Sequence, residues 1–324
     1  MRSKLEDYTF SEQEIRILRE IASDNHLLSS LRKGLSIKSN LLSHYLRRLS
    51  GKNLIEYRKH SLSLEGKAEK SGKYLYFSDS KHASSLKELL LKYDYIEWGS
   101  ILSGLGIEVF FQILAGHNVS YESFSRVTFW RYSKDFMSRG MVDMDGDFYR
   151  ISPRFSLLAD FLSEYQQFIM SRIVESLPQP ALTLWQKDFE CLIRLPKNVK
   201  IDNTEFQKTA TSRFQDFGVQ LTSDSDIYFY SRRRKTIRIE DIILHTLLVE
   251  RDSIRYATYA LLLLKKESKG ISKEYLLEEA TWLDLGLKVN TMYEFLRTKG
   301  VRSGLTLPTW VEFVNKAREY GVRA

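Results

Sequence analysis

The sequence predicts a mainly α-helical protein with small β-structure: two helix-and-hairpin modules in tandem, followed by a mixed α/β and helical C-terminal domain. Apolar residues recur at helical spacing through most of the 324 residues. Two helical stretches each lead into paired β-rich runs joined by polar segments that contain glycine. Pro178 and Pro180 then mark a boundary, beyond which strand-like runs precede a series of helices.

The first module begins with a helix predicted over residues 11–23. Ser11 is a good N-cap and Glu14 follows three residues later, as in a capping box. Apolar residues then repeat at helical spacing. A short second helix is predicted over residues 26–33, ending at Gly34.

A third helix, capped by Ser36 and closed by Gly51, is predicted over Ile37–Leu49. The runs 54–59 and 73–77 are rich in β-forming residues and flank a polar segment, which predicts a hairpin. Three helices followed by a hairpin is the order of elements in a winged helix-turn-helix.

Positive charge is concentrated in this module. Between Ser36 and Lys73 the net charge is +6, against +8 for the whole chain. In such modules the third helix enters the major groove and flanking cations hold phosphates. We therefore expect DNA contacts from polar residues of the third helix and from cations after it, namely Lys38, Ser39, Asn40, Ser43, His44, Arg47, Arg48, Lys52, Arg58, Lys59, Lys67, Lys70 and Lys73. A solvated charged face is the alternative.

Residues 15–21, 35–49 and 52–55 resemble the winged-helix transcriptional regulators of the MarR and ArsR type, especially archaeal ones. The resemblance covers about a quarter of the chain. It implies binding of double-stranded DNA, with a recognition helix at about 37–49 and a wing at about 54–77. The segment between the two predicted strands is longer and more charged than is usual in that family.

A second module of similar order follows. Its helices are predicted around 98–102 and 107–114, over 121–124 with Ser120 as cap, and from 127 to 139, before a hairpin over 141–151. Arg126, Arg131, Lys134 and Arg139 accompany aromatic residues on its last helix. The hairpin carries three carboxylates that would repel phosphate, namely Asp143, Asp145 and Asp147. They favour a structural or partner-binding role for the second module over the binding of a second DNA half-site.

A long helix is predicted from about Pro153 to Ser176. Its apolar stripe is either a candidate homodimer surface or a stripe that packs within one chain. The stripe consists of Phe155, Leu158, Phe161, Leu162, Tyr165 and Phe168. The predicted domains are thus residues 1–92, 93–177 and 178–324.

In the third domain, residues 182–194 and 227–230 have strand character. Helices are predicted over residues 239–250, 253–266, 273–282, 289–299 and 308–320. The run Thr236–Leu248 resembles a segment of abortive-infection antitoxin and nucleotidyltransferase-associated proteins. Glu240 and Asp241 in this run also suit a helix N-terminus. The basic run 231–235 just before it fits either a contact with an anionic partner or a solvated loop.

The sequence contains no motif that predicts catalysis. It has no P-loop, no His-Glu-x-x-His and no Gly-x-Ser-x-Gly motif, and its six histidines are dispersed. Asp224-Ser225-Asp226 and Asp143-Met144-Asp145 lack the upstream Gly-Ser of nucleotidyltransferases. Cys191 is a single thiol, so it forms neither an internal disulfide nor a Cys-rich zinc site. We expect no enzyme activity, metal or cofactor.

The expected protein is cytoplasmic, because neither a signal peptide nor a membrane-spanning apolar run is present. The favoured function is transcription regulation by binding to double-stranded DNA, as a candidate homodimer. The alternative is an antitoxin-like protein that binds a protein partner through residues 178–324 and regulates its own gene by binding DNA. A nucleic-acid-modifying enzyme is a third, less favoured interpretation.

Overall fold

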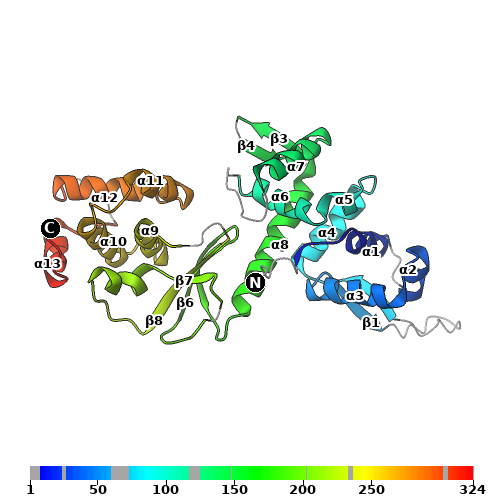
Figure 1. The fold of residues 1–324 in the computed structure, drawn as a ribbon, viewed down its shortest axis with the longest axis horizontal. Coiled ribbons are helices and arrows are strands. Elements are labelled where there is room, and N and C mark those ends of the chain that lie inside the picture. The colour runs from blue at the N-terminus through cyan, green and yellow to red at the C-terminus, as the bar shows by residue number, and fades with distance from the viewer. Residues whose placement is uncertain are drawn as a thin grey trace. The chain divides into compact units, whose positions relative to one another are not determined.

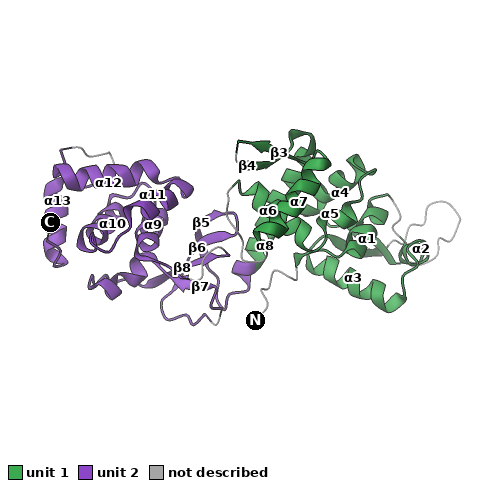
Figure 2. Cartoon of the chain, turned by 45° about the horizontal axis from the view of Figure 1, so that its top comes forward, with its two compact units in different colours: residues 1–172 green, residues 173–324 purple. Residues whose placement is uncertain are grey.

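A computed structural model describes residues 8–23, 27–59, 73–116, 125–146, 148–201, 203–232, 236–301 and 306–323. The chain divides into two compact units, residues 1–172 and 173–324 (Figure 2). The described elements are mainly helices with small sheets, which confirms the predicted fold class. Along the described residues, no helix is both long and apolar enough to cross a lipid bilayer.

Unit 1 opens with three helices and an antiparallel hairpin (Figure 1). These elements are α1 (Glu12–Ala22), α2 (Leu28–Gly34), α3 (Ser39–Gly51), β1 (Ile55–Lys59) and β2 (Lys73–Phe77), followed by α4 (Lys81–Lys92). The strands pair in register from Ile55 opposite Phe77 to Lys59 opposite Lys73. Leu27, between α1 and α2, adds an antiparallel bridge to Tyr74.

The ends of these helices test two predicted caps. The capping box of α1 is confirmed, since Ser11 and Glu14 each bond the backbone N–H of the other. The prediction that Ser36 caps α3 is wrong. Ser36 adopts a left-handed φ of 53° in the turn, and Lys38 occupies the N-cap without a side-chain hydrogen bond.

The rest of unit 1 repeats the order of helices and hairpin. It comprises α5 (Trp98–Leu102), α6 (Leu105–Leu114), α7 (Arg126–Ser138), β3 (Val142–Asp145), β4 (Phe148–Ile151), a 3₁₀ turn (Pro153–Phe155) and most of α8 (Ser156–Glu175), whose last three residues belong to unit 2. β3 and β4 pair antiparallel. The helix predicted over 121–124, its cap Ser120 and the hairpin residue Asp147 lie outside the described residues.

The two predicted N-terminal modules share one core, so the predicted boundary between residues 92 and 93 falls inside unit 1. Helix α1 packs against both α4 and α5. Phe10 forms a parallel bridge with Ser103, and its ring stacks on that of Tyr165 at 5.4 Å between centroids. The predicted apolar stripe of α8 is buried within this unit, apart from half-buried Phe168. It therefore packs within the chain and does not offer a dimer surface.

The described residues of unit 2 form a four-stranded antiparallel sheet in the order β5-β6-β8-β7 and five α-helices. The strands are β5 (Leu182–Lys187), β6 (Glu190–Pro196), β7 (Phe206–Lys208) and β8 (Ser225–Ser231), with a 3₁₀ helix at Ala210–Phe217. The helices are α9 (Ile239–Val249), α10 (Ile254–Lys266), α11 (Lys273–Trp282), α12 (Gly286–Thr298) and α13 (Trp310–Glu319).

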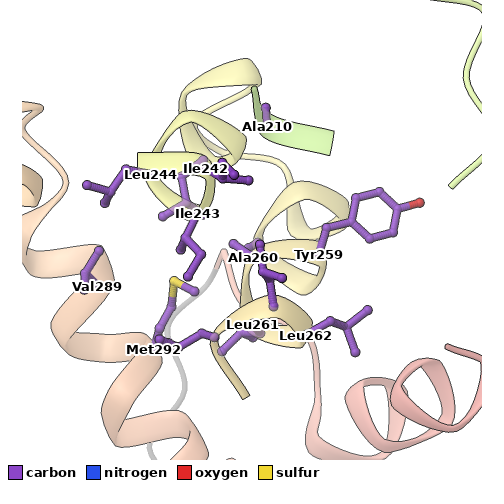
Figure 3. Packing of buried hydrophobic residues seen from close by; sticks show 14 of the residues in the cluster. Ala210, Ile242, Ile243, Leu244, Tyr259, Ala260, Leu261, Leu262, Val289 and Met292 are labelled. Atoms are coloured by element: carbon purple, nitrogen blue, oxygen red, sulfur yellow. The ribbon is translucent and has the colours of Figure 1, made fainter. Parts of the chain in front are cut away.

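Helix α9 lies at the centre of unit 2. From Glu240 to Val249 every residue of α9 is buried, which explains why this helix is apolar around most of its circumference. Ile243 of α9, Leu261 of α10 and Met292 of α12 meet in the same cluster of buried side chains (Figure 3). The predicted helices of this domain are confirmed, with ends shifted by up to three residues.

Candidate nucleic-acid interface

Helix α3 separates an apolar side from a polar side. Leu42, Leu46 and Leu49 recur at helical spacing and are buried. The solvent side carries the predicted contact residues, of which six are exposed: Lys38, Ser39, Asn40, Ser43, His44 and Arg47. The structure thus brings these six residues together on one helix and its N-cap.

Several polar groups on this surface are already organised by local hydrogen bonds. Ser43 Oγ donates to the carbonyl of Ser39 at 2.9 Å, and Asn40 Oδ1 accepts from the backbone N–H of Leu41 at 2.9 Å. The Asn40 amide nitrogen stays available as a donor. Among the described residues, Lys38 and Arg47 form no ion pair with a carboxylate. Their charges are therefore available to an anion in solution.

Lys52 is not part of this surface, and its predicted role as a DNA contact is corrected. The side chain is buried, with its ammonium 2.8 Å from Glu14 Oε1 and 5.3 Å from the centre of the Phe10 ring. Glu14 is fully buried as well. A buried carboxylate needs a compensating cation, and Lys52 supplies it from the end of α3.

The Arg48 side chain is partly buried and partly exposed to solvent. Its Nε lies 3.1 Å from Glu14 Oε1, and its Nη2 donates to the carbonyl of Thr9 at 3.2 Å. The side chain remains 36% exposed. This arginine therefore fixes the N-terminal segment against α3, and only part of its guanidinium is open to a ligand.

The cations of the hairpin fall into three groups. Arg58 is exposed but pairs with Glu56 and Asp79 and lies over the Tyr76 ring at 5.3 Å. The hydrogen bond to Glu56 raises the pKa of the Arg58 guanidinium. Lys73 is exposed, and no described carboxylate pairs with it. Of the remaining predicted contacts, Lys59 is the last residue of β1, and its side chain is not described. Lys67 and Lys70 lie outside the described residues.

Beneath α3 the structure shows a polar layer that the sequence analysis missed. His82 of α4 contacts the carbonyl of Lys52 through Nε2 at 2.9 Å and stacks on Phe168 at 4.3 Å. Burial lowers the pKa of His82 below its ordinary value of 6.5. The capping-box spacing identified Glu14, but no spacing rule links Glu14 to Lys52 or Lys52 to His82.

The second module is less uniformly charged. Arg126, Arg131 and Lys134 are exposed on α7, whereas Arg139 pairs with Asp135 at 3.0 Å. On the adjoining hairpin Arg150 pairs with Asp145 at 2.9 Å. Carboxylates thus accompany the cations here, unlike on the solvent side of α3.

The other chemical candidates of the sequence do not assemble into a site. Asp226 forms an ion pair with Lys208 at 2.7 Å. Burial raises the pKa of the Cys191 thiol to about 12. In the described part of the chain, no three His, Cys, Asp or Glu side chains are grouped to hold a metal ion.

The run from Thr236 to Leu248 has a structural role in unit 2. Asp241 accepts from the backbone N–H of Arg238 and from the Tyr275 hydroxyl. Glu240 accepts from the backbone N–H of Ser272, at the N-terminus of α11. These buried carboxylates fix α9 against α11. His245 Nδ1 lies 2.8 Å from the Thr209 hydroxyl, which connects α9 to the segment after β7.

Comparison with known protein families gives a match inside unit 2. Residues 203–322 match the family model described as HVO_2833_C, C-terminal. The matched segment begins before β7 and ends after α13, so it contains α9, α10, α11, α12 and α13. Comparisons with curated proteins and with solved structures found no match. Over residues 203–322, the chain is therefore similar to the C-terminal domain that this family model describes.

Proposed function

We propose that this chain is a cytoplasmic transcription regulator that binds double-stranded DNA through a winged helix in unit 1. The observation that carries the proposal is the solvent side of α3. It presents Lys38 and Arg47 without carboxylate partners in the described chain, together with Asn40, Ser43 and His44. Arg, Asn and Ser side chains are suited to base edges in a major groove, and Lys is suited to phosphates.

The arrangement around α3 supports this assignment. The order α1, α2, α3, β1, β2 is that of a winged helix, and the bridge between Leu27 and Tyr74 places a third extended segment beside the hairpin. Burial of Lys52 under α3 refines the proposed DNA-contacting set. That set is Lys38, Ser39, Asn40, Ser43, His44, Arg47 and Lys73, with partial contributions from Arg48 and Arg58.

The decisive experiment measures affinity for duplex DNA selected from a random pool, using fluorescence anisotropy at several salt concentrations. Lys38→Ala with Arg47→Ala should weaken binding at least about tenfold, because two phosphate or base contacts are lost. Lys197→Ala with Lys200→Ala removes two exposed cations of unit 2 and is the matched control. Equal affinity of all three proteins would contradict the proposal, as would failure of the pool to yield any bound duplex.

A second candidate function is an antitoxin-like role in which unit 2 binds a protein partner. It is favoured by the independence of unit 2, which has its own core and contains the segment that matches a family model. Binding of DNA by unit 1 does not account for a second unit of this size. Co-purification of residues 1–324 with the product of an adjacent gene would support this role.

A further inference from the structure

Leu41 of helix α3 is an apolar side chain that the packing of unit 1 leaves exposed. Leu42, Leu46 and Leu49 are buried, whereas Leu41 is 46% exposed. Across the described parts of α1, α2 and α3, it is the only large hydrophobic side chain that is exposed. A single exposed leucine is ordinary on a protein surface. The role of Leu41 therefore depends on which side chains lie beside it.

Leu41 lies beside residues that are proposed to contact DNA. His44 follows Leu41 by three positions and Asn40 by four, so it is a neighbour of both on the helix surface. Successive side chains of a helix point about 100° apart, and helical spacing places His44 between Asn40 and Leu41. All three side chains are exposed and lie in the first two turns of α3. The N-terminal residues of a recognition helix are those that contact base edges.

The Asn40 amide presents an oriented hydrogen-bond donor at this place. The helical bonds of α3 begin with the Leu42 N–H, which donates to the Lys38 carbonyl at 3.0 Å. The N–H of Leu41 comes before this bond and has no carbonyl in a preceding turn. It donates instead to Asn40 Oδ1 at 2.9 Å. The amide oxygen is thereby bound to the backbone, and the amide nitrogen is the group of Asn40 that is left to donate to a ligand.

Thymine is the base whose major-groove edge matches a donor beside an apolar side chain. It carries the O4 acceptor and the C5-methyl group on adjacent ring atoms, whereas cytosine offers a donor there and the purines carry no methyl group. We infer that Asn40 donates to O4 of a thymine in the bound duplex and that Leu41 contacts the methyl group of the same base. Leu41 is then a specificity-determining residue of α3.

The surroundings of Leu41 favour DNA over a protein as the occupant of this surface. Helix α3 contains no carboxylate, and the exposed cations Lys38 and Arg47 lie on the same helix and its N-cap. One leucine among cations and polar groups suits a base edge flanked by phosphates. The inference rests on the proposed function and deepens it by naming the base that is recognised.

The first experiment measures whether affinity depends on a thymine methyl group. A duplex selected from a random pool by the wild-type chain is remade with deoxyuridine in place of one thymine at a time, which removes the C5-methyl group and keeps O4 and the base pair. At one thymine, affinity in fluorescence anisotropy should fall about fourfold, the effect of one methyl group leaving an apolar contact. Leu41→Ala should bind the thymine and deoxyuridine duplexes equally, because it lacks the side chain that contacts the methyl group.

Leu91→Ala is the matched control, because Leu91 of α4 is 47% exposed and lies outside the proposed DNA-contacting set. It should keep the wild-type response to deoxyuridine. A wild-type chain that binds its duplex and is indifferent to deoxyuridine at every thymine would overturn the inference and leave the proposed function intact. The same holds if Leu41→Ala keeps the fourfold loss. Failure of the wild-type chain to bind any duplex would overturn both.

A second experiment exchanges the donor of Asn40 for an acceptor. At the same position, 5-methylcytosine keeps the methyl group of thymine but replaces the O4 acceptor with an amino donor. The wild-type chain should bind this duplex about tenfold more weakly than the thymine duplex, since two donors then face each other. Asn40→Asp, whose carboxylate accepts, should prefer 5-methylcytosine. Damage to the fold does not reverse a preference, so an unchanged preference for thymine in Asn40→Asp would refute the role assigned to Asn40.

Discussion

The ammonium group of Lys52 lies 2.8 Å from the carboxylate of Glu14, with both side chains buried beneath the proposed recognition helix. Glu14 also caps the N-terminus of α1 and contacts Arg48. One carboxylate therefore joins the start of α1 to the end of α3. This pair fixes the helix that carries the candidate DNA contacts.

Removing Glu14 should destabilise unit 1 severely. In Glu14→Ala, Lys52 loses the carboxylate that lies 2.8 Å from its ammonium, and removing one partner of a buried ion pair costs about 3–5 kcal/mol of unfolding free energy. Lys52→Met should cost less, because Arg48 and the capping box still satisfy Glu14. Urea denaturation followed by circular dichroism gives both values. The explanation would be wrong if Glu14→Ala were the milder of the two.

The buried and exposed cations of α3 should differ in the salt dependence of DNA binding. Each phosphate contact contributes about −0.9 to the slope of log affinity against log salt concentration. Arg47→Ala should therefore reduce the slope by about one if Arg47 contacts a phosphate, while Lys52→Met, measured where it is folded, should leave it unchanged. Anisotropy titrations between low and high salt measure the slope. A reduced slope in Lys52→Met would contradict its burial.

Unit 1 should lose stability in mild acid through His82. Burial lowers the pKa of His82 in the folded state below 6.5, so on acidification the unfolded chain takes up a proton before the folded chain does. Stability is unaffected above pH 6.5 and falls as the pH drops from there toward the lowered folded pKa. Melting temperatures of wild type and His82→Phe, measured from about pH 7 to pH 5, should diverge in their pH dependence. Parallel curves would show that His82 does not titrate in this way.

The acidic residues of the Thr236–Leu248 run should matter for stability and not for DNA binding. Asp241→Ala removes an acceptor for both the Arg238 N–H and the Tyr275 hydroxyl, and hydrogen bonds to charged groups are worth about 1.5–3 kcal/mol each. Tyr275→Phe removes only one of them and should cost correspondingly less. Thermal unfolding of the two variants measures the loss. Duplex affinity below the melting temperature should match that of wild type.

Local chemistry in the sequence was sufficient for much of the secondary structure. The Ser11–Glu14 spacing predicted the start of α1, and helical periodicity predicted α3 and the five helices of unit 2. Alternating β-rich runs predicted both hairpins. These features depend on residues within a few positions of one another, so a sequence pattern records them directly.

The sequence also determined where positive charge is concentrated, but only the tertiary structure decided which cations face the solvent. Lys52 lies among the cations expected to contact DNA, yet its ammonium is buried against Glu14, 38 residues away in the chain. Likewise, the apolar stripe of α8 predicts that this side of the helix is buried, but it does not predict which residues cover it. In the fold, the Phe10 ring packs against Phe161 and Tyr165 of the stripe. Burial of a charge depends on a compensating group brought close by folding, and such long-range pairing leaves no periodic signal in the sequence.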